Sequence, residues 1–457
     1  MEAIRKEQDL QQAVQEHTGA ADSPQALREQ MERLSAHGGF GLLESAIESA
    51  ASLNPDYPAR NNIFLTEGRK KADREALLQT LTQWAEVLEQ GDISGMVDYC
   101  DKQAEHCGQV LQQDMTRAVG ASRDLERSYR NAAFFFKNCE VDRVRNVSFI
   151  NCSPDQLKDL EDTRFANAIS AELVQHYDRL DLRNNYSILV IPGYLGSNSL
   201  VEKWAKIAFD NKVMMITDFE HLDEPDDIME MFALSGLASG DIFKSNVIMT
   251  CNWLTGRGKL SALGEESDLY VPPSGALAGK IYSTLMSQVT AGKKFGVLNG
   301  VDGVKFELKK TEIANLEKMG LVPIVRDFGK VMAFSAKTLF NGDNLGLQTY
   351  SVVRVFDYVT KVLIDFLNRR AFENFNANTR KELMNQIVTF LDSITGPDKL
   401  VEDFTIRRFE QDSVQKDRIH LDIHMKPYFP AKNFLIRMEG QKRDDGNHWG
   451  TAYDQDK

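Results

Sequence analysis

The sequence predicts an α/β (α+β) fold with a helical N-terminal region and antiparallel strands near the C-terminal end. Three observations support this prediction. Residues 1–118 carry apolar side chains at helical spacing among many polar ones. From about residue 124, short apolar runs alternate with helical segments, as in a core with some parallel strand pairing. Residues 403–440 return to the period-two alternation of strands.

The first expected region, residues 1–118, is helical and rather polar. We expect helices over residues 2–16 and 42–53, and one that starts at Ser23, with Pro24 at its first position. Two prolines in residues 54–62 indicate an extended linker. The helix expected over residues 69–89 has one apolar stripe, made of Leu77, Leu78, Leu81, Trp84, Val87 and Leu88.

The second expected region, residues 119–345, is an α/β domain. Alternation predicts a strand over residues 141–153, after which Ser153 opens a helix through Leu160. Strands are expected at residues 186–191, 213–219, 246–254 and 303–310, with a helix over 199–212. Thr311 is expected to cap a short helix that Gly320 stops.

The third expected region, residues 346–457, is a C-terminal domain of paired helices and terminal strands. The helix over residues 350–369 buries an apolar stripe and leaves Arg354, Asp357, Lys361 and Asp365 off it. A second helix starts with the capping box of Thr379 and Glu382 and ends near residue 396. Strands over residues 403–410, 418–426 and 433–440 are expected to finish the chain.

Composition excludes several functional classes. A chain of 457 residues with 42% hydrophobic and 26% charged residues is ordinary for a globular protein of two or three domains. The formal net charge of −13 argues against nucleic-acid binding, which needs an excess of Lys and Arg. No apolar run approaches the ~20 residues that span a bilayer, and the charged N-terminus lacks a signal-peptide pattern. We therefore expect a cytoplasmic protein without membrane insertion.

Motifs for catalysis or cofactors are not matched. The loop with Gly193 and Gly196 follows a strand and precedes a helix, as phosphate-binding loops do, but matches neither glycine-rich fingerprint. Residues 236–240 place their serine one position late for a nucleophile elbow. The five cysteines, at positions 100, 107, 139, 152 and 251, include no C-x-x-C pair. We expect reduced thiols, no cofactor and no catalytic residue.

The strongest candidate for a metal site is a stripe of His420, Asp422 and His424. These residues alternate along one strand and so share one face, and their side chains are of the types that ligate metals. A half-exposed strand also shows a polar face without any metal. We favour the second interpretation, a surface or interface face, and expect no metal.

Three stretches of the sequence together resemble the contractile sheath proteins of phage tails and type VI secretion systems. Residues 270–283, "YVPPSGALAGKIYS", are similar to a segment of phage tail sheaths, and residues 297–339 follow the sheath order of strand, Thr-capped helix, turn and strand. Residues 350–391 resemble the paired helices of the family, with Arg354 and the joint at residues 372–374.

The flanks are similar to the large type VI sheath subunit, the TssC/VipB family. Residues 127–162 resemble its aromatic segment, strand and helix, and residues 425–440 its closing strands. Tyr428 stands where the common form has His, and residues 128–131 replace a familiar Trp-Arg-Gly-Leu. A divergent branch, such as that of the Bacteroidetes, fits these departures.

The resemblance implies a contractile tail-sheath fold and a mechanical function. Such subunits pair with a small partner, TssB (VipA), stack with further copies as hexameric rings around an Hcp-like inner tube, and rest on a baseplate. Contraction drives the tube outward, and a ClpV-type AAA+ unfoldase recycles the sheath, for which residues 1–118 would be the handle. No nucleic acid partner is implied.

The same resemblance assigns the terminal strands to an intersubunit β-sheet, because an exposed edge can accept a neighbour's strand. The residues assigned to it are Arg418, Ile419, Leu421, Ile423, Met425, Phe434, Leu435, Ile436, Arg437 and Met438. Candidate contacts to the tube are Arg369, Arg370, Arg380 and Lys381, for which a solvated helix face is the other interpretation. A phage-type sheath and, from another class, an α/β enzyme that binds metal or nucleotide are the alternatives.

Overall fold

The computed structural model describes residues 71–144, 146–152, 154–159, 164–177, 185–432, 435–441 and 448–454, together with residues 25, 29, 30, 32 and 33. The chain divides into two compact units, residues 1–120 and residues 121–457. The expected helices at residues 2–16 and 42–53 and the linker at 54–62 lie outside the described residues. The few residues described after Ser23 are helical.

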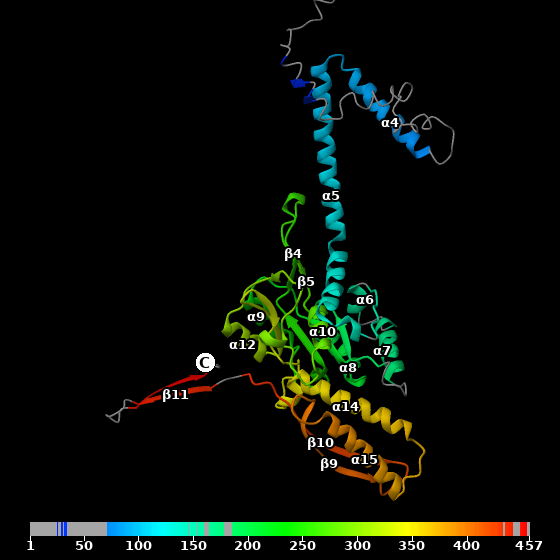
Figure 1. Cartoon of the computed structure of the whole chain (residues 1–457), viewed down its shortest axis with the longest axis vertical. Helices are drawn as coiled ribbons and strands as arrows, with labels where there is room; N and C mark the ends of the chain where they lie inside the picture. Colours follow the sequence, from blue (N-terminus) through cyan, green and yellow to red (C-terminus); the bar gives the residue numbers. More distant parts are fainter. Residues whose placement is uncertain are drawn as a thin grey trace, which may run out of the picture. The chain divides into compact units, whose positions relative to one another are not determined.

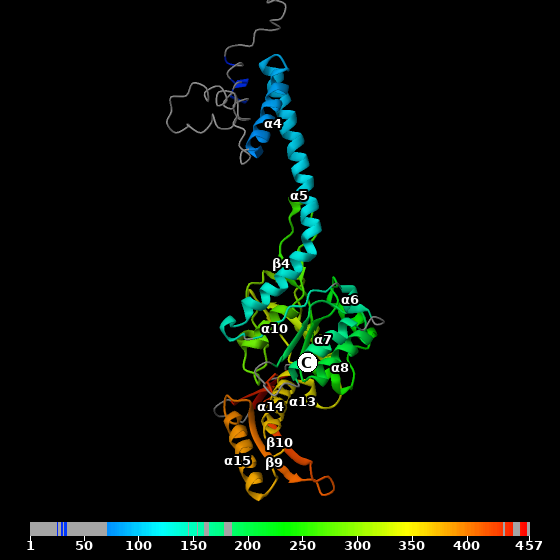
Figure 2. The same ribbon diagram turned by 90° about the vertical axis from the view of Figure 1, so that its right-hand side faces the viewer.

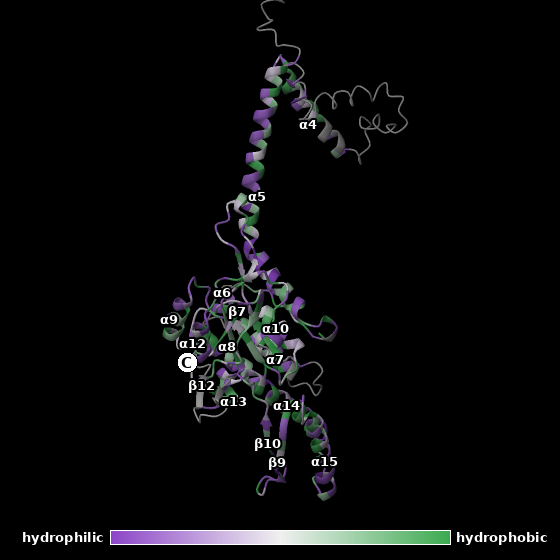
Figure 3. Ribbon diagram, turned by 60° about the vertical axis from the view of Figure 1, so that its left-hand side comes forward, coloured by the Kyte–Doolittle hydropathy of each residue, from purple (hydrophilic) through white to green (hydrophobic). Residues whose placement is uncertain are grey.

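The first unit contains α4 (Lys71–Leu88) and the beginning of α5 (Ile93–Asn138). Trp84, Val87 and Val97 are buried, and the first two of these belong to the predicted stripe. Leu78 and Leu88 of the same stripe are exposed instead. Hydrophilic and hydrophobic residues alternate along α5, as Figure 3 shows. The helix continues without a break into the second unit, past residue 118 where the sequence suggested a boundary.

The core of the second unit is a sheet with helices around it (Figure 1). Five strands of this sheet are described, in the order β1-β2-β3-β7-β8. The strands are β1 (Ile188–Ile191), β2 (Met214–Asp218), β3 (Val247–Cys251), β7 (Leu321–Asp327) and β8 (Lys330–Ala333). The first four run parallel, and β8 returns antiparallel to β7. The strands expected at residues 186–191, 213–219 and 246–254 and their parallel pairing are confirmed.

Helices cover both faces of this sheet because the strand side chains alternate. Met215, Val247 and Met249 face a cluster formed with α7 (Arg164–Tyr177), α8 (Asn198–Asp210), α9 (Pro225–Ser235) and α12 (Lys310–Lys318). Met214 and Ile248 face a second cluster, formed with the end of α5, α10 (Ser274–Ser283) and the start of α14 (Tyr350–Arg369). The central strands are therefore apolar throughout, as expected for a sheet covered on both sides.

Shorter elements complete the α/β part. They are the helices α6 (Pro154–Lys158), α11 (Gly292–Phe295) and α13 (Leu345–Gln348), the 3-10 turns η3 (Val141–Arg143), η5 (Ile242–Asn246) and η6 (Ser261–Leu263), and a small sheet of β4 (Leu254–Arg257), β5 (Leu269–Val271) and β6 (Gly303–Val304). The strand expected at residues 303–310 is thus reduced to two residues.

The C-terminal part packs α14 and α15 (Ala377–Ile394) on a hairpin of β9 (Val401–Gln411) and β10 (Ile419–Pro427) (Figure 2). A second hairpin pairs β11 (Leu435–Gln441) with β12 (His448–Asp454). The sequence predicted α14 at its observed bounds and the strands β9, β10 and β11, but it did not indicate β12. Among the described residues, no helix is both long and apolar enough to cross a bilayer.

Four expectations about local structure are wrong. Residues 146–152 form no strand, because no described strand pairs with them. Lys309, not Thr311, precedes α12, and its backbone amide is bonded to Glu312. Asn376, not Thr379, caps α15 by accepting from two backbone amides. The predicted stop at Gly320 is confirmed, since Gly320 follows the C-cap residue Met319 and its φ of +100° is left-handed.

The fourth error concerns α14. Arg354 and Lys361, expected off its buried stripe, are each only 7% exposed. The helix lies between the second cluster at its start and a third cluster with α15, β9 and β10, so it is buried on more than one face. A single amphipathic stripe predicts one buried face only.

Candidate functional site

The backbone groups of Gly193, in the loop after β1, are hydrogen-bonded to side chains of the protein itself. The backbone amide of Gly193 donates to the Asp218 carboxylate at 2.8 Å, and the Thr217 hydroxyl donates to the Gly193 carbonyl at 3.0 Å. A phosphate-binding loop needs free amides that point at the ligand. Here a carboxylate already occupies that place and would repel an anion, so the loop is a structural turn.

Asp218 is the centre of this arrangement, and the sequence did not single it out. The carboxylate is fully buried and also accepts from the Ser274 amide at 2.8 Å and the Thr250 hydroxyl at 2.5 Å. Burial raises the pKa of Asp218, while these hydrogen bonds act in the opposite direction. The group joins β2, β3, the glycine loop and the start of α10. No local motif indicates it, because its three partner residues, Gly193, Thr250 and Ser274, come from distant parts of the chain.

The histidine stripe on β10 does not form a metal site in the structure. Asp412 accepts a hydrogen bond from His420 at 2.7 Å, whereas Asp422 and His424 are exposed and lie opposite Arg408 and Thr405. This bond and two backbone amides hold the pKa of Asp412 below its usual range. The described residues contain no group of three or more His, Cys, Asp and Glu side chains that could hold a metal ion.

The other face of β10 is part of the protein core. Leu421, Ile423 and Met425 pack against the cluster that contains Leu383, Ile387 and Phe409. Ile419, at the start of the strand, is 42% exposed. The alternation predicted from the sequence is therefore present, with an inner apolar face and an outer polar one.

The terminal strands were assigned to an intersubunit sheet. In the structure, each of them pairs along one edge with another strand of the same chain. β10 is antiparallel to β9, with a register shift between Asp422 and Ile423, and β11 is antiparallel to β12. Each hairpin forms a two-stranded sheet of its own in the described residues. Every one of these strands therefore keeps one edge whose backbone groups have no described ladder partner. Phe434 lies outside the described residues.

The four cationic residues expected to contact the tube differ in their surroundings. Arg369 is bonded to Asp365 at 2.9 Å, and Arg370 to Glu382 at 2.6 Å. Arg380 and Lys381 are exposed on α15, and their side chains make no hydrogen bond or ion pair with the described residues. The second pair is thus available for an anionic partner, whereas the first is already neutralised.

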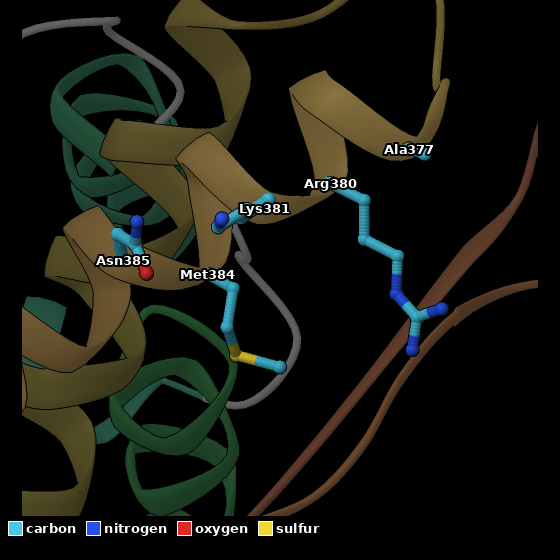
Figure 4. A pocket seen from close by; sticks show the side chains of 5 residues that line it. All are labelled: Ala377, Arg380, Lys381, Met384 and Asn385. Carbon is cyan, nitrogen blue, oxygen red and sulfur yellow. The ribbon is translucent and has the colours of Figure 1, made fainter.

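Arg380 and Lys381 border a shallow surface pocket on α15. Its described lining residues follow helical spacing, and Figure 4 shows that all of them come from this one helix: Ala377, Arg380, Lys381, Met384 and Asn385. Met384 contributes an apolar floor that continues into the third cluster. The lining residues place two cations, an amide and a thioether on one face of α15. Such a face can bind a protein surface that carries acidic groups.

A partly buried ionic network fastens α5 to the small sheet. Arg257 on β4 is bonded to Glu126 at 2.9 Å and to Glu265 at 2.5 Å. Arg123 of α5 also pairs with Glu265 and donates to the Asp268 carbonyl. The Arg257 guanidinium lowers the pKa of Glu265 to about 2. These contacts are structural, since every charged group in them has a protein partner.

Comparison with known proteins gives three matches to family models. The TssC/VipB-like N-terminal region matches residues 27–115, the central domain of type VI secretion system TssC/VipB matches residues 117–341, and the TssC/VipB-like C-terminal domain matches residues 349–455. No curated protein matches the chain.

Several solved structures of contractile systems are similar to this one. The helical sheath of the anti-feeding prophage (AFP) in its contracted state is 16% identical, with 69% of this chain and 81% of that chain covered and a TM-score of 0.49. A chain of the AFP baseplate is 16% identical over 67% and 84%, with a TM-score of 0.45. A sheath tail protein of Desulfitobacterium hafniense is 10% identical over 64% and 59%, with a TM-score of 0.41.

Proposed function

Because the chain belongs to the TssC/VipB family of type VI secretion system proteins, we propose that it pairs with the small subunit TssB, polymerises around an Hcp-like tube and propels that tube by contraction. The chain is a structural subunit of a contractile sheath and not an enzyme. The observation that carries the proposal is the order of the three matches, which follow one another from residue 27 to residue 455.

The terminal strands each have an edge without a ladder partner in the described part of the chain, and these edges support polymerisation. A strand edge presents unpaired N–H and C=O groups, and a strand of a neighbouring subunit can complete the ladder. We assign residues 418–425 and 434–439 to such an intersubunit sheet. Strands linked in this way would keep subunits attached to one another while their bodies rotate during contraction.

Contraction by this protein requires no nucleotide site. The extended lattice can be held metastable by the tube, and the contracted lattice can be lower in free energy because it buries more surface. The structure supports this view at the glycine loop, where Asp218 occupies the position that a phosphate would need.

Arg380 and Lys381 are the better candidates for contact with the tube. Both are exposed and have no acidic partner among the described residues, whereas Arg369 and Arg370 are paired with carboxylates. A surface contact between such cations and acidic residues of the tube would be weak for each pair and would add up around a ring.

The N-terminal helical region, residues 1–118, is the handle that we assign to a ClpV-type AAA+ unfoldase. Hexameric rings would grow from a baseplate in the cytoplasm. Domains over residues 119–345 and 346–457 would then form the wall of the sheath, with the terminal strands between subunits.

The test is coexpression with the small sheath subunit, followed by negative-stain electron microscopy. We expect tubules or cogwheel-shaped rings from the two proteins together and neither from this chain alone. Tubules from this chain alone would favour a phage-type sheath instead. Soluble monomers in both preparations would contradict the proposal.

A further inference from the structure

The turn between β7 and β8 carries an aromatic side chain in an unfavourable position. Asp327, the last residue of β7, pairs with the first residue of β8, so Phe328 and Gly329 form a two-residue connection. Both have positive φ, +47° and +72°. Such turns favour Asn or Asp before Gly, because these residues tolerate the left-handed backbone better than bulky side chains do. Phe328 is nevertheless 84% exposed, and a strained, exposed aromatic residue indicates a role in binding.

Cationic side chains surround this phenylalanine. The Nζ atom of Lys293, on α11, lies 4.7 Å from the centroid of the Phe328 ring. Lys294 follows on the same helix, which packs against β8, and Arg326 precedes the turn on β7. These three cations are exposed, and none of them makes an ion pair with the residues that the structure describes. We call Phe328, Lys293, Lys294 and Arg326 the basic tip.

The outer side of α9 has the opposite charge and apolar side chains of its own. Met231 is 46% exposed and Leu234 is 78% exposed, although both lie on a helix whose inner side is buried. Asp227 and Glu230 lie at helical spacing from them and so share this side. Both carboxylates are exposed and form no ion pair within the described part of the chain. We call Asp227, Glu230, Met231 and Leu234 the α9 face.

The basic tip and the α9 face do not cover each other within one molecule. Phe328 and Leu234 are the most prominent apolar side chains of the two surfaces, and both remain mostly exposed in the isolated chain. Exposed apolar groups rimmed by charges are typical of surfaces that bind another protein. Aromatic, methionine and arginine side chains are also the types enriched in such interfaces. Both surfaces therefore have the composition of an interface.

A second copy of the chain offers the partner for each surface. The formal net charge of −13 means that copies of this protein repel one another over most of their surface. Attraction between copies needs a cationic patch on one that meets an anionic patch on the other. The basic tip and the α9 face provide this pair of patches, and each also presents apolar groups to the other.

We propose that the basic tip of one subunit docks on the α9 face of the next copy, with the Phe328 ring against the apolar side chains of that face and the cations of the tip beside its carboxylates. Because the two surfaces differ, the contact is heterologous and can repeat from copy to copy without closing in pairs. The contact is small, so it is weak between two isolated copies and adds up in an assembly of many. This last step rests on the proposed sheath function.

Exchange of charges between the two surfaces tests their pairing by coexpression with the small sheath subunit. Arg326→Glu with Lys293→Glu brings like charges together, so the protein concentration needed for tubules should rise at least about tenfold. Asp227→Lys with Glu230→Lys should do the same. The chain with all four changes has opposite charges again and the parent's net charge, so this concentration should return to within about threefold of the parent value. Two charges are reversed each time because a single exposed ion pair contributes little.

Replacement of Phe328 separates assembly from folding. Phe328→Asn places a residue that tolerates positive φ before Gly329, so the midpoint of thermal unfolding of the purified chain should rise by about 2 °C. The same change removes the apolar anchor and should raise the concentration needed for tubules at least about tenfold. Leu285→Asn, at another exposed apolar side chain, should leave assembly unchanged. A purely structural role of Phe328 predicts instead that stability and assembly change in the same direction.

Cross-linking of two differently tagged copies tests the contact independently of tubules. One copy carries Phe328→Cys and the other carries Leu234→Cys, and a short bismaleimide joins the two thiols where the surfaces meet. Peptide mass spectrometry identifies the linked positions and separates them from links through the exposed native Cys107. The link should form in the coexpressed assembly and, at raised protein concentration, in the chain alone.

The outcomes separate this inference from the proposed function. Tubules without the cross-link would leave the sheath function standing and overturn the contact. The cross-link without tubules would support the contact and contradict the proposed function. Loss of tubules in both double variants, without recovery in the chain with four changes, would assign the two surfaces to other partners. Assembly of Phe328→Asn at the parent concentration would exclude the basic tip.

Discussion

Gly279 of α10 lies directly against the backbone of α5, so that a Cβ atom at Gly279 would overlap the carbonyl oxygen of Phe135. One turn earlier, Gly275 approaches Asn131 in the same way, and the Asn131 side chain donates to the Pro272 carbonyl at 2.9 Å. Glycine at these positions lets the two helices touch through their backbones. The end of α5 is therefore fixed in the second unit by close packing.

Substitution of Gly279 should loosen this packing. We expect Gly279→Ala to lower the free energy of unfolding by about 2 kcal/mol, because overpacking outweighs the gain in helix propensity. Chemical denaturation of the purified chain measures this change. Gly258→Ala, where a Cβ would meet open space, should stay within about 0.5 kcal/mol of the parent chain. Equal effects of both variants would contradict the close contact.

The ion pair of Arg257 and Glu265 should make the free energy of unfolding depend on pH in the acid range. The pKa of Glu265 is lowered from 4.5 to about 2, so the folded state holds the charged form more strongly than the unfolded chain does. Its stabilising contribution is complete above pH 4.5 and is lost as the pH falls toward 2. Glu265→Gln should therefore cost about 2 kcal/mol at pH 7 and progressively less below pH 4.5.

Denaturation curves at several pH values measure this dependence. Glu266→Gln is the matched control, because the neighbouring Glu266 is exposed and makes no ion pair with the described residues. Its effect on the free energy of unfolding should be small. A constant cost of Glu265→Gln from pH 7 to pH 2 would argue against the lowered pKa.

Replacement of two buried cations on α14 should change the free energy of unfolding in opposite directions. Arg354 has no hydrogen-bond partner at Nη1 among the described residues, and burial lowers its pKa to about 10. Lys361 donates to the Asn185 side chain at 2.9 Å and to the Tyr186 carbonyl at 2.8 Å. Arg354→Met should raise the free energy of unfolding by about 1 kcal/mol or more, since it removes an uncompensated buried charge.

Lys361→Met provides the comparison on the same helix. We expect it to lower the free energy of unfolding by about 2 kcal/mol, because two partly buried acceptors lose their donor. Thermal and urea denaturation of both variants at neutral pH measure the difference. A loss of stability in Arg354→Met as large as that in Lys361→Met would show that Arg354 has a stabilising partner.

Charge reversal on α15 should weaken attachment to the tube without unfolding the chain. Arg380→Glu combined with Lys381→Glu changes two exposed side chains and should alter stability by about 0.5 kcal/mol at most. Cosedimentation of assembled sheath with Hcp-like tube should fall, and the loss should be greatest at low salt. Lys330→Glu, also an exposed cation, should leave cosedimentation unchanged. Unaltered tube binding in the double variant would exclude this face of α15.

Removal of residues 433–457 should separate folding from polymerisation. This deletion takes away β11 and β12, which pair with each other and with no other described strand. The remaining chain should keep its cooperative unfolding transition and lose tubules in the coexpression test. Intact tubules after the deletion would refute the assignment of β11 to the intersubunit sheet.

The sequence by itself determined the elements whose signals are local. The apolar runs of β1, β2 and β3, the bounds of α14 and the alternation of β9 and β10 were all predicted, because each depends on a periodic pattern within a few turns or one strand. The same patterns failed at the caps of α12 and α15, where neighbouring polar residues compete for one position.

Only the tertiary structure decided how those elements are covered. Residues 147–152 have the alternation of a strand but no ladder in the described chain, and α14 buries Arg354 and Lys361 because it packs on more than one face. Asp218 accepts hydrogen bonds from three separate segments. Periodicity in the sequence indicates which side chains are turned away from water. A β-ladder or a buried charge also needs a partner group from another segment of the chain, and only the packed fold decides which segment lies beside it.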